Sequence, residues 1–383
     1  MKTMTITYHA SNNCGSFLQA YALQQTLINM FSVENTIIDF RSRELIQNYS
    51  LFRPFRSPKN AFKNLYSLIH YKSLKTRAAR FEAARRQYLQ LTDTIHDMSD
   101  LICKRQAADL YIAGSDQIWN TTAPDFSEAF FLPGFSNKAA YGISLGSDYM
   151  KAPLSAYVQS IQEFCSISAR ETQGAEEISK YYDRSVSVVS DPALLLSEEQ
   201  YSLFVSDGSP ESATDKKNEE NYIFYYSMKY TTPGLRQTVA LSKETGLPMI
   251  TVFTNYHTCR VPHGMKVYYD AGPKEFLRLL SRAKIVVTDS YHGTIFSILY
   301  HKPFVYPVAE QDRDDRIRNL LGSLQIPIDS VSAEAVLCGR GIDWTSTDRQ
   351  IELQRSHSLA FIEKMLDACK TVNQEASNVS SHF

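Results

Sequence analysis

Short apolar runs alternate with amphipathic segments along most of the chain. Runs of about four to eight apolar residues, rich in β-branched side chains, are typical of strands buried on both faces of a sheet. We predict such strands at 3–9, 36–40, 109–113, 139–145, 166–169, 185–189, 222–227, 248–253, 285–288 and 304–307. Apolar residues at helical spacing predict helices at 17–30, 234–245, 273–282 and 348–372. Strands that alternate with helices indicate parallel sheets that are covered on both faces.

One polar stretch interrupts this alternation. Residues 206–221 read SDGSPESATDKKNEEN and contain no apolar side chain larger than alanine, which is typical of a linker. A chain of 383 residues also exceeds the usual size of a single core. We therefore expect two doubly wound, Rossmann-like α/β domains, at 1–205 and 222–383, that face each other across a cleft. The helix at 348–372 could pack back on the first domain.

The composition excludes several classes of protein. With 43% hydrophobic and 21% charged residues and a net charge of −1, the chain resembles ordinary globular proteins and shows no overall preference for a polyanion. No apolar run reaches roughly 18 residues, the length of a membrane span. The first residues form a strand pattern without a signal-peptide core. The six cysteines are scattered, which fits reduced thiols. We expect a cytoplasmic protein.

Positive charge is concentrated in residues 41–90, which lie in an insert, 41–107, of the first domain. This stretch holds 12 Lys or Arg against two Glu, so the rest of the chain carries a net charge of −11. Aromatic residues are interleaved with the basic ones. Such a segment can contact an anionic membrane surface or a lipid-linked substrate. The alternative is a solvated helical hairpin whose aromatic side chains pack inward. No nucleic-acid-binding module accompanies the segment, so we expect no nucleic-acid partner.

The segment from Thr288 to Thr294, TDSYHGT, joins a buried strand to a helix. Ligands of open α/β sheets bind at such strand ends, and the free N–H groups of a helix N-terminus favour an anion. His292 and the neighbouring hydroxyls could therefore bind and protonate a phosphorylated substrate. The alternative is a histidine that only caps the helix or completes a hydrogen bond.

Two further motifs follow predicted strands. Asn13 and Gly15 precede the first helix, where they could let a ligand approach the backbone or could form a simple turn and helix cap. In the GSDQIWN segment, Asp116 could accept hydrogen bonds from sugar hydroxyls or act as a base, and Trp119 could support a sugar ring. A capping aspartate followed by a core tryptophan would give the same pattern.

Two arginines are candidate anion ligands. Arg170 follows a short strand beside Glu171 and could bind a carboxylate or phosphate with two hydrogen bonds, or form a surface ion pair. Arg316 alternates with acidic residues on a predicted helix and could either reach into the cleft or be neutralised on the surface. We interpret Asp191-Pro192 as the end of a strand and the start of a helix.

In this order, the motifs resemble those of the polysaccharide pyruvyltransferase family. The resemblance extends from Thr5 to Gly322, and the ordered set is more specific than any one motif. The matching segments are Asn13-Cys14-Gly15 with Leu18 to Leu23, Gly114 to Trp119, Ser168 to Glu171, Ser190 to Pro192, Gly272 to Leu277, Thr288 to Gly293 with Phe296-Ser297, and Arg316-Ile317 with Leu320 to Gly322.

The resemblance implies a GT-B-like fold and an enzyme that transfers pyruvate from phosphoenolpyruvate to a sugar of a lipid-linked surface polysaccharide precursor, with formation of a cyclic ketal. It implies no cofactor beyond phosphoenolpyruvate as co-substrate, and the site residues require no metal. The implied catalytic residues are His292, Arg170 and Asp116. The implied donor-binding residues are Arg170, Ser290, Tyr291, His292, Gly293, Thr294 and Arg316. The implied acceptor-binding residues are Asn13, Gly15, Ser115, Asp116 and Trp119.

In this scheme His292 protonates the methylene carbon of the donor, Arg170 holds its carboxylate or balances the leaving phosphate, and Asp116 or Asn13 orients the acceptor. One departure stands out, because some family members carry an arginine where this chain has Ser290. Either Arg170 or Arg316 then binds the anion, or the donor differs. Two alternatives therefore stay open: a glycosyltransferase of the same fold that uses a nucleotide sugar, and a non-enzymatic sugar-binding subunit.

Overall fold

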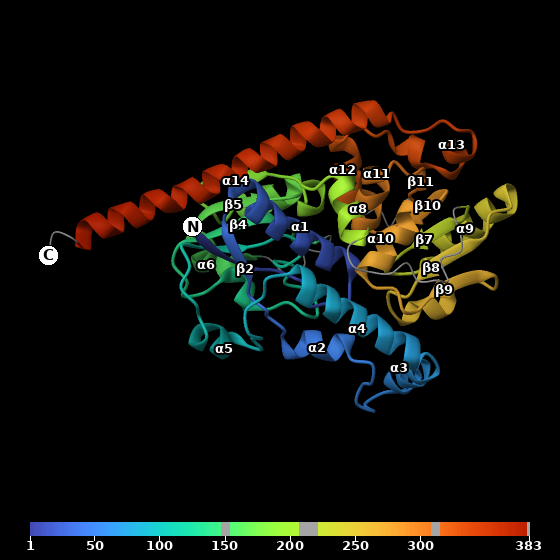
Figure 1. Ribbon diagram of the computed structural model, residues 1–383, viewed down its shortest axis with the longest axis horizontal. Coiled ribbons are helices and arrows are strands. Elements are labelled where there is room, and N and C mark those ends of the chain that lie inside the picture. The colour runs from blue at the N-terminus through green and yellow to red at the C-terminus, as the bar shows by residue number, and fades with distance from the viewer. Residues whose placement is uncertain (147–153, 207–220, 308–314, 381–383) are drawn as a thin grey trace.

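The computed structural model describes residues 1–146, 154–206, 221–307 and 315–380, and the side chains up to residue 368 (Figure 1). The expected linker, 206–221, lies outside these residues except at its two ends. None of the described helices is both long and apolar enough to span a membrane.

The first half of the chain forms a six-stranded parallel sheet with the order β2-β1-β3-β4-β5-β6. The strands are β1 (Lys2–Ile6), β2 (Glu34–Ile37), β3 (Leu110–Ala113), β4 (Lys138–Ile143), β5 (Phe164–Ala169) and β6 (Val186–Val188). Their connections include α1 (Cys14–Phe31), η1 (Glu128–Phe131), η3 (Leu154–Tyr157), α6 (Val158–Gln162), α7 (Thr172–Ser179) and η4 (Pro192–Leu194). The strand order reverses between β1 and β3, and such a switch point opens a crevice at the carboxyl ends of the strands.

The second half forms a five-stranded parallel sheet with the order β11-β10-β7-β8-β9. The strands are β7 (Ile223–Tyr226), β8 (Met249–Val252), β9 (Met265–Tyr268), β10 (Ile285–Thr288) and β11 (Phe304–Val305). The helices are α8 (Glu198–Ser206), α9 (Thr232–Thr245), η5 (Tyr256–Arg260), α10 (Pro273–Ser281), α11 (Tyr291–Leu299), α12 (Asp315–Ser323), η6 (Ile328–Val331) and α13 (Ala333–Leu337). Here the switch point lies between β7 and β10. The two doubly wound parallel sheets confirm the predicted fold class.

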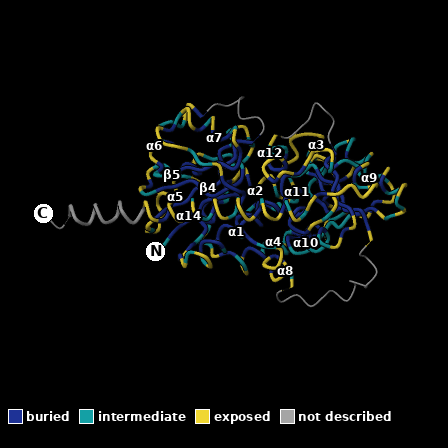
Figure 2. Tube along the Cα trace, turned by 90° about the horizontal axis from the view of Figure 1, so that it is seen from above, coloured by how far each residue is buried: buried dark blue, intermediate teal, exposed yellow. Residues whose placement is uncertain are grey.

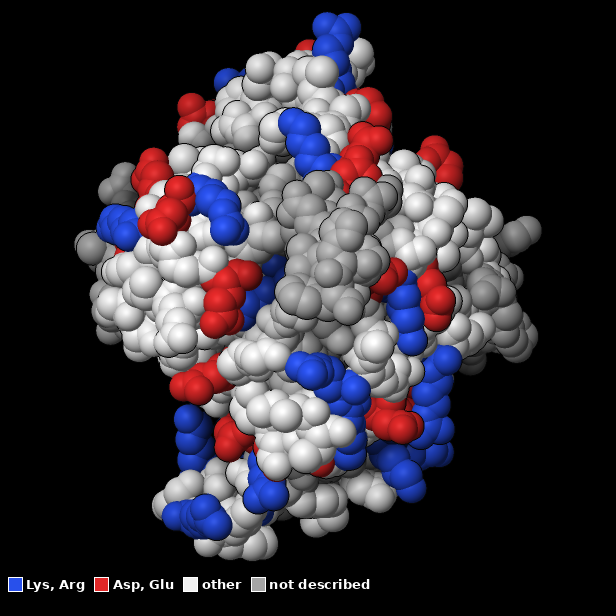
Figure 3. Space-filling view, turned by 90° about the vertical axis from the view of Figure 1, so that its left-hand side faces the viewer, with Lys and Arg blue, Asp and Glu red and all other residues white. Residues whose placement is uncertain are grey.

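The insert folds as four helices: α2 (Arg43–Tyr49), α3 (Pro58–Ile69), α4 (Tyr71–Tyr88) and α5 (Met98–Cys103). The helical-hairpin interpretation is right for α3 and α4, but only some aromatic side chains pack inward. Tyr66 is 8% exposed, whereas Phe55 is 82% and Phe62 50% exposed. On the face shown in Figure 3, Lys and Arg side chains are frequent over the lower part of the molecule, the side on which Figure 1 places the insert.

The two halves share one hydrophobic cluster. Phe17 of α1 belongs to the same buried cluster as Phe276 of α10 and Ile295 of α11. A last helix, α14 (Trp344–Ser380), runs along both halves (Figure 1) and contributes Ile362 to a cluster that contains strands of the first sheet. Figure 2 shows the sheets buried beneath exposed helix faces. The halves are therefore held together by apolar packing as well as by chain connections.

Candidate active site at the junction of the two sheets

Side chains that follow four different strands meet between the two halves. Arg170 Nη1 lies 2.7 Å from Asp191 Oδ2, and Arg170 Nη2 lies 3.8 Å from Asp116 Oδ1. From the second half, His292 Nε2 lies 3.5 Å from Asp191 Oδ2. These residues follow β5, β6, β3 and β10, so the carboxyl ends of the two sheets face each other, as the predicted architecture requires.

Arg170 is surrounded by carboxylates of its own chain. Its Nε lies 2.8 Å from Glu171 Oε1, which also accepts a hydrogen bond from the Ser144 hydroxyl. The side chain is only 1% exposed, and the nearby carboxylates outweigh burial to raise the pKa of Arg170 well above its ordinary value. We call Asp116, Arg170, Glu171 and Asp191 the carboxylate cluster. Its arginine forms a buried ion pair and not the surface ion pair that we considered as an alternative.

Asp191 has a larger role than its sequence context indicates. Its Oδ1 caps η4 by accepting the Ala193 N–H at 2.9 Å, which is the strand-to-helix role that we predicted. Its Oδ2 meets both Arg170 and His292. Burial alone would raise the pKa of Asp191, but His292 and Arg170 hold it below the usual range. Only the position of Ser190-Asp191-Pro192 at a strand end could have pointed to this second role.

His292 is fixed between the first turns of two helices. A Cβ added to Gly15 would lie 2.3 Å from His292 Nδ1, so the ring packs directly on the α1 backbone. Its other nitrogen, Nε2, is buried and faces Asp191 without a well-aligned hydrogen bond. The N-termini of α1 and α11, from different halves, thus meet at this ring. Helix N-termini carry partial positive charge, so their meeting favours an anion.

The residues around His292 hold the start of α11 in place. Ser290 caps the helix by accepting the Gly293 N–H at 3.4 Å, and the Thr294 hydroxyl donates to the Ser290 carbonyl. A Cβ on Gly293 would lie 2.3 Å from Thr288 Oγ1, so only glycine lets α11 approach β10 this closely. Ser290, Gly293 and Thr294, which we expect to bind the donor substrate, thus also stabilise the loop that carries His292.

Asp116 has an uncommon backbone conformation, with φ +75°. Aspartate tolerates this left-handed region better than most residues do, and such conformations recur at functional sites. Its Oδ2 accepts a hydrogen bond of 2.8 Å from the Ser16 hydroxyl, and its Oδ1 accepts the Gln117 N–H. The carboxylate is thus held in one orientation at the crevice between β1 and β3.

Two expected acceptor residues need correction. Trp119 is 1% exposed, donates its indole N–H to the Phe130 carbonyl and stacks on Phe131, so it is a core residue and cannot support a sugar ring. Ser115 is fully buried and cannot contact an acceptor either. Asn13 remains partly exposed, and its side chain caps α1 by accepting the Gly15 N–H.

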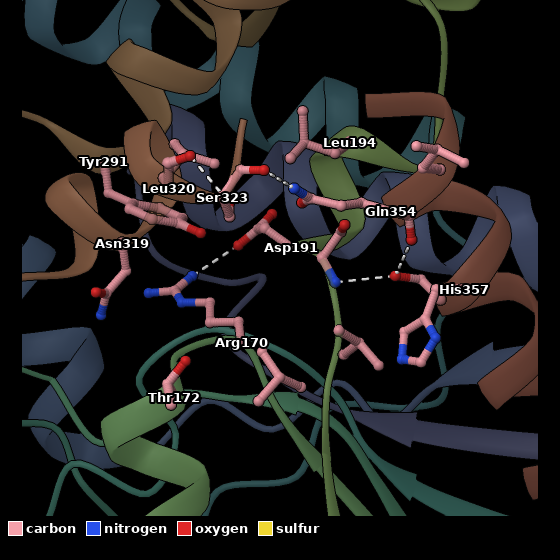
Figure 4. Close-up of a pocket in the computed structure, with 15 residues that line it drawn as sticks. Arg170, Thr172, Asp191, Leu194, Tyr291, Asn319, Leu320, Ser323, Gln354 and His357 are labelled. Carbon is pink, nitrogen blue, oxygen red and sulfur yellow. Dashed lines mark hydrogen bonds and ion pairs between the residues drawn. The ribbon is translucent and has the colours of Figure 1, made fainter. Parts of the chain in front are cut away.

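A cavity of about 340 Å³ adjoins the carboxylate cluster on the side of α12 and α14. Figure 4 shows Arg170 and Asp191 at its centre, with Asn319 on one side and His357 on the other. Tyr291 also lines it, with the guanidinium of Arg170 4.4 Å from the centre of its ring. The guanidinium carbon of Arg316 lies 5.9 Å from the same ring centre, so Tyr291 is in contact with both arginines.

Metal ligation has no candidate here, because the described residues include no group of three His, Cys, Asp or Glu side chains placed to hold an ion. The site instead combines a histidine, carboxylates in fixed orientations and the N-termini of two helices. Such a set suits proton transfer to or from a bound anion and orientation of hydroxyl groups.

Solved structures of low sequence identity share the fold. The chain aligns with MnaA of S. aureus, solved with UDP, at a TM-score of 0.52 and 12% identity over 88% of this chain and 87% of that one. It aligns with a putative UDP-N-acetylglucosamine 2-epimerase of Listeria monocytogenes at a TM-score of 0.51 and 10% identity over 93% and 90%. A UDP-N-acetylglucosamine 2-epimerase of Rickettsia bellii gives a TM-score of 0.51 and 9% identity over 98% of both chains. These likenesses support a GT-B-like fold.

The sequence comparisons identify the family. No curated protein matches the chain. The family model of polysaccharide pyruvyl transferase, however, matches residues 13–311, a range that begins at the cap of α1 and includes the carboxylate cluster and His292. Since this match covers most of the chain, the protein belongs to the polysaccharide pyruvyl transferase family.

Proposed function

We propose that this protein transfers the pyruvyl group of phosphoenolpyruvate to a sugar of a lipid-linked polysaccharide precursor and forms a cyclic ketal. The observation that carries the proposal is the position of His292, which lies where two helix N-termini meet and faces the ionised Asp191. A bound anion and a proton donor are the two things that enol phosphate chemistry needs at one place. Membership of the family supports the same reaction.

The proposed reaction begins with proton transfer from His292 to the methylene carbon of phosphoenolpyruvate, which becomes a methyl group. Asp191 Oδ2, at 3.5 Å from His292 Nε2, faces the ring and helps to orient it for this step. A sugar hydroxyl then adds to the oxocarbenium-like carbon and returns its proton to His292. The C–O bond to phosphate breaks, and a neighbouring hydroxyl closes the ketal and gives its proton to the departing phosphate. Asp116 and Asn13 orient the acceptor.

Arg170 is proposed to act as a positioning residue. The resemblance assigns it to the carboxylate or phosphate of the donor, but its guanidinium already faces Asp116, Glu171 and Asp191. We infer that Arg170 holds these three carboxylates in position and partly neutralises their negative charge. Ser290 to Thr294 and Arg316 remain the proposed donor side, where the first turn of α11 supplies backbone N–H groups.

The insert is proposed to bring the enzyme to its acceptor. Residues 41–90 combine a net charge of +10 with exposed aromatic side chains, which suits peripheral contact with an anionic membrane surface. We propose that the protein acts in the cytoplasm, at the membrane face where lipid-linked sugars are assembled.

A phosphate-release assay tests the proposed function. We expect wild-type protein to release phosphate from phosphoenolpyruvate only when a sugar acceptor is present, and His292→Asn to lose at least about 100-fold of that rate. His301→Asn is the matched control, since His301 is half-exposed and pairs with Asp348 away from the site. Retained activity in His292→Asn would refute the assignment. Stabilisation by UDP without any response to phosphoenolpyruvate would instead favour a nucleotide-sugar glycosyltransferase.

A further inference from the structure

A second and larger cavity, of about 690 Å³, lies between the insert and the second half of the molecule. Helices α2, α3 and α4 form one wall, and the segments that follow β7 and β8 form the other. Among the described residues, six Lys or Arg line it and no Asp or Glu does. We call it the cationic pocket, and its basic residues are Arg53, Lys59, Lys63, Arg77, Lys229 and Arg260.

The innermost cation of this pocket is buried without a carboxylate. Arg77 is 6% exposed, and its Nη2 donates to the Asn12 carbonyl, but its Nε has no hydrogen-bond partner among the described residues. Burial lowers the pKa of Arg77, and no described acidic residue forms an ion pair with it. A buried charge without a counter-charge is costly, so the site favours an anion. In the part of the chain that the structure describes, the buried Nε of Arg53 has no hydrogen-bond partner either.

The outer cations repel one another. Burial and the nearby charges of Arg53 and Lys59 lower the pKa of Lys63. Burial also lowers the pKa of His257, and the charges of Arg260, Lys59 and Lys63 act in the same direction. One monoanion cannot neutralise charges that lie on both walls of a cavity. A ligand with several negative charges, such as a diphosphate, matches both the number and the spread of these donors.

The inner end of the pocket lies beside the proposed acceptor site. Asn12, which lines the pocket, is next to Asn13 in the chain, and Tyr49 lines it from α2. The pKa of the buried Tyr49 hydroxyl is raised to about 12, mainly by burial and also by the charges of Asp125 and Asp116. Tyr49 thus lines the cationic pocket and is near enough to Asp116 to feel its charge. A ligand in the pocket can extend a sugar toward that carboxylate.

The outer end continues into an exposed apolar stripe on α3. Phe62 lines the pocket and is 50% exposed. Leu65 and Ile69 follow it at spacings of three and seven residues, on the same helix face, and are 57% and 68% exposed. An apolar chain that leaves the pocket at Phe62 would cover this stripe.

We propose that the cationic pocket binds the diphosphate of an ester whose sugar points to Asp116 and whose apolar chain leaves along α3. The sugar end of this assignment rests on the proposed function, whereas the diphosphate end rests on the pocket alone. The chemistry of a diphosphate is shared by nucleoside diphosphates, but a nucleoside gives no reason for the apolar stripe beside the pocket.

Isothermal titration of the full chain, without phosphoenolpyruvate, tests the proposal with farnesyl diphosphate, UDP and inorganic diphosphate. We expect farnesyl diphosphate to bind most tightly. The double variant Lys59→Gln/Lys63→Gln should weaken its binding by at least about tenfold, because two charges at the ligand are lost. The control Lys72→Gln/Lys75→Gln removes two exposed lysines of α4 that do not line the pocket, and should change binding by less than about twofold.

The variant Phe62→Ser distinguishes the contribution of the apolar chain to binding from that of the diphosphate. It should weaken farnesyl diphosphate and leave inorganic diphosphate unchanged. Equal binding by both lysine variants would overturn the site, and tighter binding of UDP than of farnesyl diphosphate would overturn the apolar assignment. Since no turnover is measured, a failed phosphate-release assay with intact diphosphate binding would refute the proposed function and leave the pocket standing.

Discussion

The carboxylate cluster and the cationic pocket handle charge in opposite ways. In the cluster, Arg170 is enclosed by three carboxylates, so the charges of the chain face one another. In the pocket, six cations line one cavity, and none forms an ion pair with an acidic residue in the part of the chain that the structure describes. The side chains of the carboxylate cluster therefore stabilise one another, whereas the cationic pocket is suited to bind an anionic ligand.

This difference separates two tasks that are easily confused in a sequence. Every arginine near a strand end looks like a potential anion ligand. A buried arginine that is already paired mainly fixes the position of other groups, whereas an unpaired one gains most from a ligand. We therefore expect Arg77 and the backbone N–H groups of α1 and α11, and not Arg170, to bind anions.

The largest predicted effect is a loss of stability when arginine is replaced by methionine in the carboxylate cluster, and the same replacement in the cationic pocket is its control. Arg170→Met leaves three carboxylates without their cation and should lower the free energy of unfolding by about 3–5 kcal/mol. Arg77→Met removes a buried charge that has no carboxylate partner and should change it by less than about 1 kcal/mol. Urea denaturation followed by circular dichroism measures both. Equal losses of stability in the two variants would show that the carboxylates around Arg170 do not depend on its charge.

A second prediction concerns position alone. Gly15→Ala places a methyl group where the His292 ring lies, and a displacement of about 1 Å at a reacting group can reduce the rate about 100-fold. The rate of phosphate release should fall by that order while the protein stays folded. Gly322→Ala is the control, because a Cβ there meets nothing within 4 Å on α12. Normal activity in Gly15→Ala would show that His292 need not stay where we see it.

The smallest effect is a difference in acid sensitivity. The pKa of Asp191 is held below its ordinary value of 3.8, so its contribution to stability is complete above that pH and is lost as the pH falls below it. Asp191→Asn should be less stable than wild type at pH 5 and should lose less stability between pH 5 and pH 3. The difference in free energy of unfolding between wild type and Asp191→Asn, measured by urea denaturation, should therefore be smaller at pH 3 than at pH 5. An equal difference at both pH values would mean that the cluster does not hold Asp191 ionised.

Much of the fold is predictable because the buried strands are apolar and separated by clear turns. The strand at 285–288 has the predicted bounds, and Gly246 ends α9 in the left-handed conformation typical of a helix cap. The strand β9 was not predicted, because its residues Lys266 to Tyr268 are exposed or half-buried at the sheet edge and lack an apolar run.

The site is less predictable, since its key contacts join distant parts of the chain. The sequence indicates His292, Arg170 and Asp116 as candidates, and in the structure all three lie at one site between the two sheets. It does not reveal that Asp191 links Arg170 to His292, because a capping aspartate gives the same local pattern. Trp119 shows the opposite case, in which a plausible sugar platform is a core residue.

The hydrophobic cluster shared by α1, α10 and α11 has a consequence for how this architecture can change over time. Two sheets of similar design suggest exchangeable modules. Here the packing of Phe17 with residues of the second half makes each half part of the other's interior. Grafting one half onto another partner would expose both surfaces unless the facing helices travelled with it. The two halves therefore form one packing unit and not two separable modules.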